Sequence, residues 1–110
     1  MDRDRTVRSP RALLVDDDAA TSPLHARRLT ERGYEVTASA SAETGLALAR
    51  RSPPDAIFVH VGRRGWGGSS FIQSLRSDDM TRHVPVVILA SEYDAKLKKL
   101  GLTANADGFW

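Results

Sequence analysis

The sequence predicts an α/β protein built on a parallel sheet. Short apolar segments bounded by turn residues alternate along the chain with longer segments in which apolar residues have helical spacing. Such alternation is typical of β-α-β units, whose right-handed crossovers make the strands parallel. The segment at residues 84–90 is almost continuously apolar, as expected for a parallel strand covered on both faces.

Length and composition fit one cytoplasmic domain. The 110 residues can bury a core but are too few for two domains. Residues 1–10 are polar and basic, and we expect them to be disordered. The sequence has no signal peptide and no apolar run that could span a membrane. It also lacks cysteine, which excludes disulfides and thiolate metal sites. The net charge of +2 is spread along the chain, which argues against a nucleic-acid surface.

The first half of the chain predicts two strands and two helices. Residues 12–15 form an apolar strand that runs into three consecutive aspartates. The following helix is expected to begin with Ser22 as its N-cap and to end at Gly33. Residues 34–38 alternate as a second strand, and Ser41 caps the second helix.

The central strand is predicted over residues 56–61. This apolar run contains one polar residue, His60, and is followed by a loop with four glycines, two arginines and a tryptophan at residues 62–68. In open α/β sheets, ligands bind just outside the carboxyl ends of the strands. We therefore expect a functional site at His60 and the loop that follows it.

The second half completes the pattern with two further strands. A short helix is expected to begin at Ser69 or Ser70, with its apolar residues turned inward. The strand at residues 84–90 follows, then an expected helix over residues 94–100 and the start of a fifth strand at residues 107–110. The inward residues of the short helix are Phe71, Ile72 and Leu75.

From Arg11 to Trp110, the chain resembles the receiver domain of bacterial response regulators. The matching segments are LLVDDD at 13–18, RGYEV at 32–36, SAETGL at 41–46, PDAIFV at 54–59, Gly68, VPVVIL at 84–89 and ADGF at 106–109. The resemblance implies a flavodoxin-like three-layer sandwich, with five parallel strands in the order 2-1-3-4-5. It also implies a receiver-like domain over residues 11–110 that stops after strand five, without the fifth helix.

The resemblance assigns site positions whose residues differ from the family pattern. Asp16 and Asp17 match the acidic pair that holds a divalent metal, whereas His60 stands where the family has its phosphoacceptor aspartate. Ala90 replaces the hydroxyl residue that ends strand four. Phe109 matches the aromatic residue that moves with this hydroxyl, so we expect a switch fixed in one state.

These differences predict that ordinary phosphotransfer is lost. An aspartyl phosphate requires a carboxylate nucleophile beside a metal ion. An imidazole at position 60 removes one oxygen ligand and presents a nitrogen, which Mg²⁺ does not favour. No cofactor is therefore expected, apart from weak Mg²⁺ binding at Asp16 and Asp17.

His60 itself has three interpretations. It fills the space of the lost aspartate and hydrogen-bonds Asp16 or Asp17, it forms a pH-sensitive ion cluster with them, or it acts as a phosphohistidine or transition-metal ligand. In the loop, Arg63 or Arg64 either folds onto the acidic pair in place of the metal or is solvated. Trp66 packs over the site or anchors an interface. The candidate site residues of this loop are therefore Arg63, Arg64 and Trp66.

The function predicted from these residues is that of an atypical, phosphorylation-independent receiver that acts by protein–protein contact and is not an enzyme. The partner is a signalling protein or a second copy, bound through apolar surface of strands one and five and the first helix that the missing fifth helix leaves open. One alternative is a phosphorelay receiver with a non-standard site. Another is a small-molecule or metal sensor at Asp16, Asp17 and His60.

Overall fold

The computed structural model describes residues 9–60, 68–89 and 108–109. Its elements follow one another as β1 (Arg11–Val15), α2 (Ser22–Glu31), β2 (Glu35–Ser39), α3 (Ala42–Arg51), β3 (Ala56–His60), α4 (Gly68–Ser77), β4 (Val86–Leu89) and the two-residue β5 (Gly108–Phe109). All strand pairs are parallel, in the order β2-β1-β3-β4-β5. The predicted α/β class is confirmed, while the helix expected over residues 94–100 lies outside the described residues.

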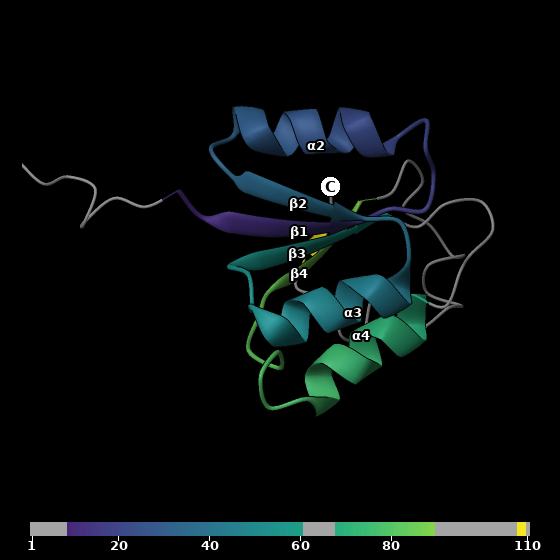
Figure 1. Ribbon diagram of the computed structural model, residues 1–110, viewed down its shortest axis with the longest axis vertical. Coiled ribbons are helices and arrows are strands. Elements are labelled where there is room, and N and C mark those ends of the chain that lie inside the picture. Colours follow the sequence, from purple (N-terminus) through teal and green to yellow (C-terminus); the bar gives the residue numbers. More distant parts are fainter. Residues whose placement is uncertain (1–8, 61–67, 90–107, 110) are drawn as a thin grey trace, which may run out of the picture.

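Three layers make up the domain. Helix α2 covers one face of the sheet, and α3 and α4 cover the other face (Figure 1). Because successive strand residues point to opposite faces, β1 and β3 supply both cores. The core on the α2 side contains Ala12, Leu14, Leu29, Ala56, Phe58 and Leu89. The core on the α3 and α4 side contains Leu13, Val15, Ala49, Ile57, Val59, Phe71, Ile72, Leu75, Val84, Val86 and Ile88.

The α2 side of the sheet is not open at β1, contrary to expectation. Ala12 and Leu14 are only 2% and 0% exposed, and Leu29 of α2 is fully buried beside them. Helix α2 packs over β1 and β2 and covers these side chains. Among the described residues, the exposed large apolar side chains are Leu24 and Met80. No helix in the described part of the chain is long and apolar enough to cross a membrane.

Helix ends agree with the sequence at two positions and differ at a third. Gly33 has a φ of 102° and ends α2 with backbone bonds to the last turn, as a left-handed C-terminal residue does. The Ser41 hydroxyl accepts a 3.1 Å hydrogen bond from the Thr44 amide and caps α3. The N-cap of α2 is Thr21, however, and not Ser22.

The Thr21 side chain does not cap the helix. Its hydroxyl donates instead to a carboxylate oxygen of Asp16, at 2.8 Å. A side-chain hydrogen bond across to the end of β1 therefore replaces the local capping bond that the sequence predicted.

Strand boundaries also shift slightly from the predictions. Strand β2 begins at Glu35 because the Tyr34 amide donates to the Leu29 carbonyl and still belongs to the end of α2. Strand β4 begins at Val86, although the Ile57 amide already donates to the Pro85 carbonyl. Helix α4 begins at Gly68, before the two expected serines, and its predicted inward residues are buried.

Candidate functional site

The carboxyl ends of β1 and β3 bring Asp16 and His60 together. The register pairs Val15 with Val59, so the next residue of each strand lies at the same edge of the sheet. The Asp16 amide donates to the Ser39 carbonyl at 2.9 Å, which fixes the backbone beyond β1. Asp16 is 2% exposed and His60 is 8% exposed. A carboxylate and an imidazole thus share a buried position at the end of the sheet.

Four groups surround the Asp16 carboxylate. Oδ1 accepts from the Asp18 amide at 2.9 Å and lies 3.0 Å from His60 Nδ1. Oδ2 accepts from the Thr21 hydroxyl at 2.8 Å and lies 3.0 Å from Nδ1 of His25. Each carboxylate oxygen therefore has two protein groups within hydrogen-bonding distance, and one of the two is an imidazole.

His25 is a site residue that the sequence did not reveal. It lies in the first turn of α2, where its amide donates to the Thr21 carbonyl. Its ring centre is 4.8 Å from that of His60, with the planes tilted by 54°. The available signal was its place in the first turn of the helix after the acidic tip, because that turn starts at the edge where β1 ends.

The charge of Asp16 is stabilised by its surroundings. Burial alone raises the pKa of this carboxyl group. Hydrogen bonds from the Asp18 amide, His25 and Thr21, together with the charge of His60, outweigh burial, so the pKa lies below its ordinary value. Since an ionised carboxylate only accepts hydrogen bonds, the Nδ1 atom of each neighbouring imidazole donates to it.

Of the other predicted site residues, two are among the described residues and four lie outside them. Asp17 is exposed, so the structure does not pair it with Asp16 in the buried site. Phe109 belongs to β5, where its backbone pairs with Ile88. The four remaining candidates lie outside the described ranges: Arg63, Arg64, Trp66 and Ala90.

The described donor set differs from the all-oxygen shell that Mg²⁺ prefers. Mg²⁺ demands a near-octahedral shell of oxygen ligands. Asp16 supplies the buried carboxylate, but both of its oxygens face imidazole nitrogens, and the predicted second carboxylate of Asp17 is exposed. Nitrogen and oxygen together are instead the ligands of first-row transition metals.

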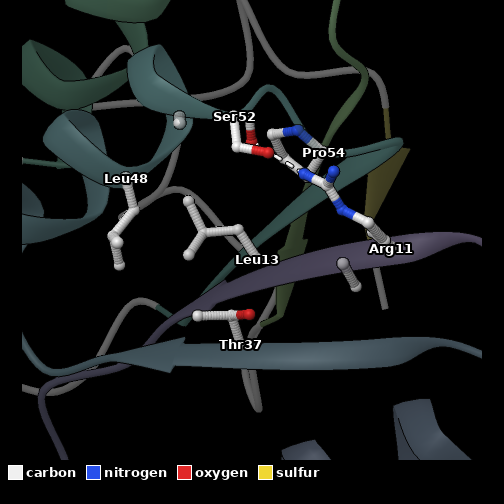
Figure 2. A pocket seen from close by; sticks show the side chains of 8 residues that line it. Arg11, Leu13, Thr37, Leu48, Ser52 and Pro54 are labelled. Carbon is white, nitrogen blue, oxygen red and sulfur yellow. Dashed lines mark hydrogen bonds between the residues drawn. The ribbon is translucent and has the colours of Figure 1, made fainter.

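A pocket of about 250 Å³ lies elsewhere, between α3 and the strands β1 and β2. Figure 2 shows Leu48 of α3 and Leu13 of β1 on its apolar side and Arg11 near the turn after α3. The guanidinium group of Arg11 donates to the Ser52 carbonyl at 2.8 Å. This pocket adjoins the amino-terminal end of β1 and does not include Asp16, His25 or His60.

Known proteins are similar to this chain in both sequence and fold. The family model described as the response regulator receiver domain matches residues 12–110. The response regulator PleD of Caulobacter vibrioides is 36% identical over 101 residues, which cover 92% of this chain and 22% of that protein. The chain thus spans less than a quarter of the length of this relative.

Two solved structures show the same architecture. The chemotaxis protein CheY4 of Vibrio cholerae has a TM-score of 0.80 at 25% identity, with 94% of this chain and 86% of that chain covered. The receiver domain of a sensor histidine kinase from Pseudomonas aeruginosa, which holds a magnesium ion in its active-site cleft, has a TM-score of 0.83 at 23% identity, with 94% and 84% covered. The chain therefore belongs to the response regulator receiver domains of two-component signalling.

Proposed function

We propose that this receiver domain does not form an aspartyl phosphate and that it signals through phosphorylation-independent contact with a partner protein. The observation that carries the proposal is the residue at the carboxyl end of β3. It is His60, and its Nδ1 lies 3.0 Å from Asp16 Oδ1.

The chemistry of His60 supports the loss of the aspartyl phosphate. The acyl phosphate of a receiver requires a carboxylate nucleophile, which an imidazole does not supply. The Nδ1 atom of His60 also lies within hydrogen-bonding distance of Asp16, and the residue is 8% exposed. The phosphoacceptor position is thus occupied by an imidazole that hydrogen-bonds Asp16.

The charge of the site supports the same proposal. In the family pattern, a metal ion neutralises clustered carboxylates and the incoming phosphoryl group. Here His25 and His60 surround the single buried carboxylate of Asp16. Hydrogen bonds from the two imidazoles take the place of the metal ion, so Mg²⁺ is expected to bind weakly.

A protein contact follows from the type of domain. Receiver domains work by interacting with kinases or effectors, and these interactions need a folded surface rather than a reaction of the receiver itself. We accordingly assign the chain to the signalling domains and not to the enzymes. If the site stays in one conformation, the binding surface is available to the partner without phosphorylation.

The test is intact-protein mass after incubation with acetyl phosphate and Mg²⁺, for the parent and for His60→Asp. We expect no added phosphoryl mass on the parent and labelling of the variant, because the substitution supplies a carboxylate beside Asp16. Circular dichroism verifies that the variant is folded. Labelling of the parent would overturn the proposal, and alkali would then distinguish an acyl phosphate, which it hydrolyses, from the alkali-stable phosphohistidine of the alternative phosphorelay function.

A further inference from the structure

We propose that Asp16, His25 and His60 form a binding site for a divalent first-row transition-metal ion, for which Zn²⁺ is the probe. The site deepens the proposed function because it assigns a ligand to the same position, and its signalling role rests on that function. Metal binding itself can be measured separately from phosphorylation.

The donor set has the composition of a zinc site. Two imidazole nitrogens and one carboxylate oxygen are ligands of zinc in proteins, where three protein ligands leave a fourth position open to water or another ligand. One possible ligand atom from each of the three residues lies within 4.8 Å of the others. Two of the three histidines of the chain belong to this site.

Each imidazole nitrogen lies near the Asp16 carboxylate, although the two nitrogens contact different oxygens of it. With metal–ligand bonds of about 2.0–2.1 Å, neighbouring ligand atoms lie roughly 3.4 Å apart. Asp16 Oδ1 and His60 Nδ1 are 3.0 Å apart, as are Asp16 Oδ2 and His25 Nδ1. An ion would therefore fit if the two imidazole rings moved slightly away from the carboxylate and closer to each other.

The carboxylate is already oriented by groups that are not ligands. The Asp18 amide holds Oδ1 and the Thr21 hydroxyl holds Oδ2, at 2.9 and 2.8 Å. Such outer partners fix the orientation of a ligand and improve metal affinity. Asp16 and His60 follow from the ends of the neighbouring strands β1 and β3, whereas His25 comes from α2.

Metal binding requires a movement of protons. A coordinating imidazole must present a nitrogen without hydrogen, whereas the Nδ1 atoms now donate to Asp16. A neutral ring transfers this proton to Nε2 through solvent, and an imidazolium ring releases one proton to solvent. In each case the hydrogen bond to Asp16 is replaced by bonds from the nitrogen and the oxygen to the metal.

The ion would tie α2 to the ends of β1 and β3. A ligand that binds only the folded state stabilises that state in proportion to the logarithm of its concentration over its Kd. Zn²⁺ is therefore expected to raise the thermal unfolding midpoint of the domain. Millimolar Mg²⁺ should not compete, because the imidazoles are poor ligands for it.

The test is calorimetric titration of the metal-free protein with Zn²⁺, with the visible absorption of bound Co²⁺ as a second readout of tetrahedral nitrogen and oxygen coordination. The decisive variant is His25→Gln, since the His25 side chain is 18% exposed and belongs to neither hydrophobic core, so its loss should leave both cores intact. The matched control is His83→Gln, because His83 is exposed and lies outside the cluster.

Loss of an outer partner alone costs about 10–100-fold in affinity, so loss of the His25 ligand should weaken Zn²⁺ binding by about 100-fold or more. His83→Gln should leave the affinity unchanged. Equal affinity of the parent and His25→Gln, or equal loss in both variants, would overturn the metal site. Zn²⁺ binding with acetyl-phosphate labelling of the parent would keep the site and overturn the proposed function instead, so the two failures are distinguishable.

Discussion

The two ends of β1 carry opposite charges and are held in different ways. At its start, the Arg11 amide donates to Asp55 at 2.7 Å and the guanidinium group donates to the carbonyls of Ser52 and Pro53, all at exposed positions. At its end, Asp16 is buried among His25, His60 and Thr21. Water can replace the partners at the first end, whereas the second end depends on protein groups.

This difference indicates where function and stability are coupled. A buried charge that loses its partners is costly, because nothing else solvates it. The Asp16 end therefore tolerates few substitutions, while the Arg11 end should tolerate many. Substitutions at the two ends should therefore differ in their effect on the free energy of unfolding.

Asp16→Ala should destabilise the metal-free domain by about 3 kcal/mol. It leaves the Asp18 amide, the Thr21 hydroxyl and two imidazoles without their shared acceptor. Urea unfolding measures the change in free energy. The matched control is Asp17→Ala at the adjacent exposed position, which should stay within about 0.5 kcal/mol of the parent. Similar losses for both variants would remove the distinction between buried and exposed aspartates.

Gly45→Ala should destabilise the domain by about 1 kcal/mol, although alanine is the better helix former. A Cβ atom at Gly45 of α3 would lie 2.8 Å from Cγ2 of Val15, which is buried directly before Asp16. Val15 is β-branched and has little freedom to move away.

Thermal unfolding in parallel with Ala47→Gly distinguishes packing from helix propensity. Ala47 is exposed on the same helix, so its replacement reports propensity alone and should cost about 1 kcal/mol. A gain in stability for Gly45→Ala would contradict the close packing of α3 on β1.

Asp55→Ala tests the exposed end of β1 and should cost no more than about 1 kcal/mol. The Arg11 amide loses its carboxylate acceptor but regains water. Asp55→Asn keeps an acceptor oxygen and should recover most of the loss in chemical denaturation. A cost as large as that of Asp16→Ala would show that the two ends do not differ in the way burial requires.

The smallest expected change in stability concerns Asp78, which forms an ion pair with Arg50, and this change depends on pH. A hydrogen bond from the Met80 amide, and then the Arg50 hydrogen bond and charge, lower the pKa of Asp78 below its ordinary 3.8 despite a smaller opposing contribution from burial. The native state thus binds this proton less readily than the unfolded state, so Asp78 contributes stability above pH 3.8 that is lost as pH falls through the lowered pKa.

Unfolding midpoints of the parent and Asp78→Asn across pH measure this contribution. Their difference should be constant near neutral pH and shrink below about pH 4. A difference that grows toward acid would have the wrong sign for a lowered pKa.

The sequence predicted the sheet better than the site. Apolar segments and their turns located β1, β3 and β4, and the meeting of strand ends placed His60 beside the acidic tip. The sequence predicted Ser22 as the cap of α2, and a place in the first turn does not by itself show that the His25 ring reaches Asp16. Thr21 is the N-cap instead, and its hydroxyl bonds Asp16.

The different burial of the two aspartates in the predicted acidic pair could not be predicted from the sequence either. Asp16 and Asp17 are adjacent in sequence, but one is buried and the other is exposed. Beyond the end of a strand, the side-chain direction depends on the loop, and here the Asp18 amide and the Thr21 hydroxyl turn the chain around Asp16. Tertiary hydrogen bonds of this kind leave no periodic signal in the sequence.

In the metal-free protein, the Asp16 carboxylate lies within hydrogen-bonding distance of Nδ1 of both His60 and His25. The most direct measurement is the long-range ¹H–¹⁵N spectrum of the histidine rings in the parent and in Asp16→Asn. The Nδ1 signals of His25 and His60 should both shift on substitution, while those of exposed His83 stay in place. Unchanged His25 and His60 signals would contradict this arrangement.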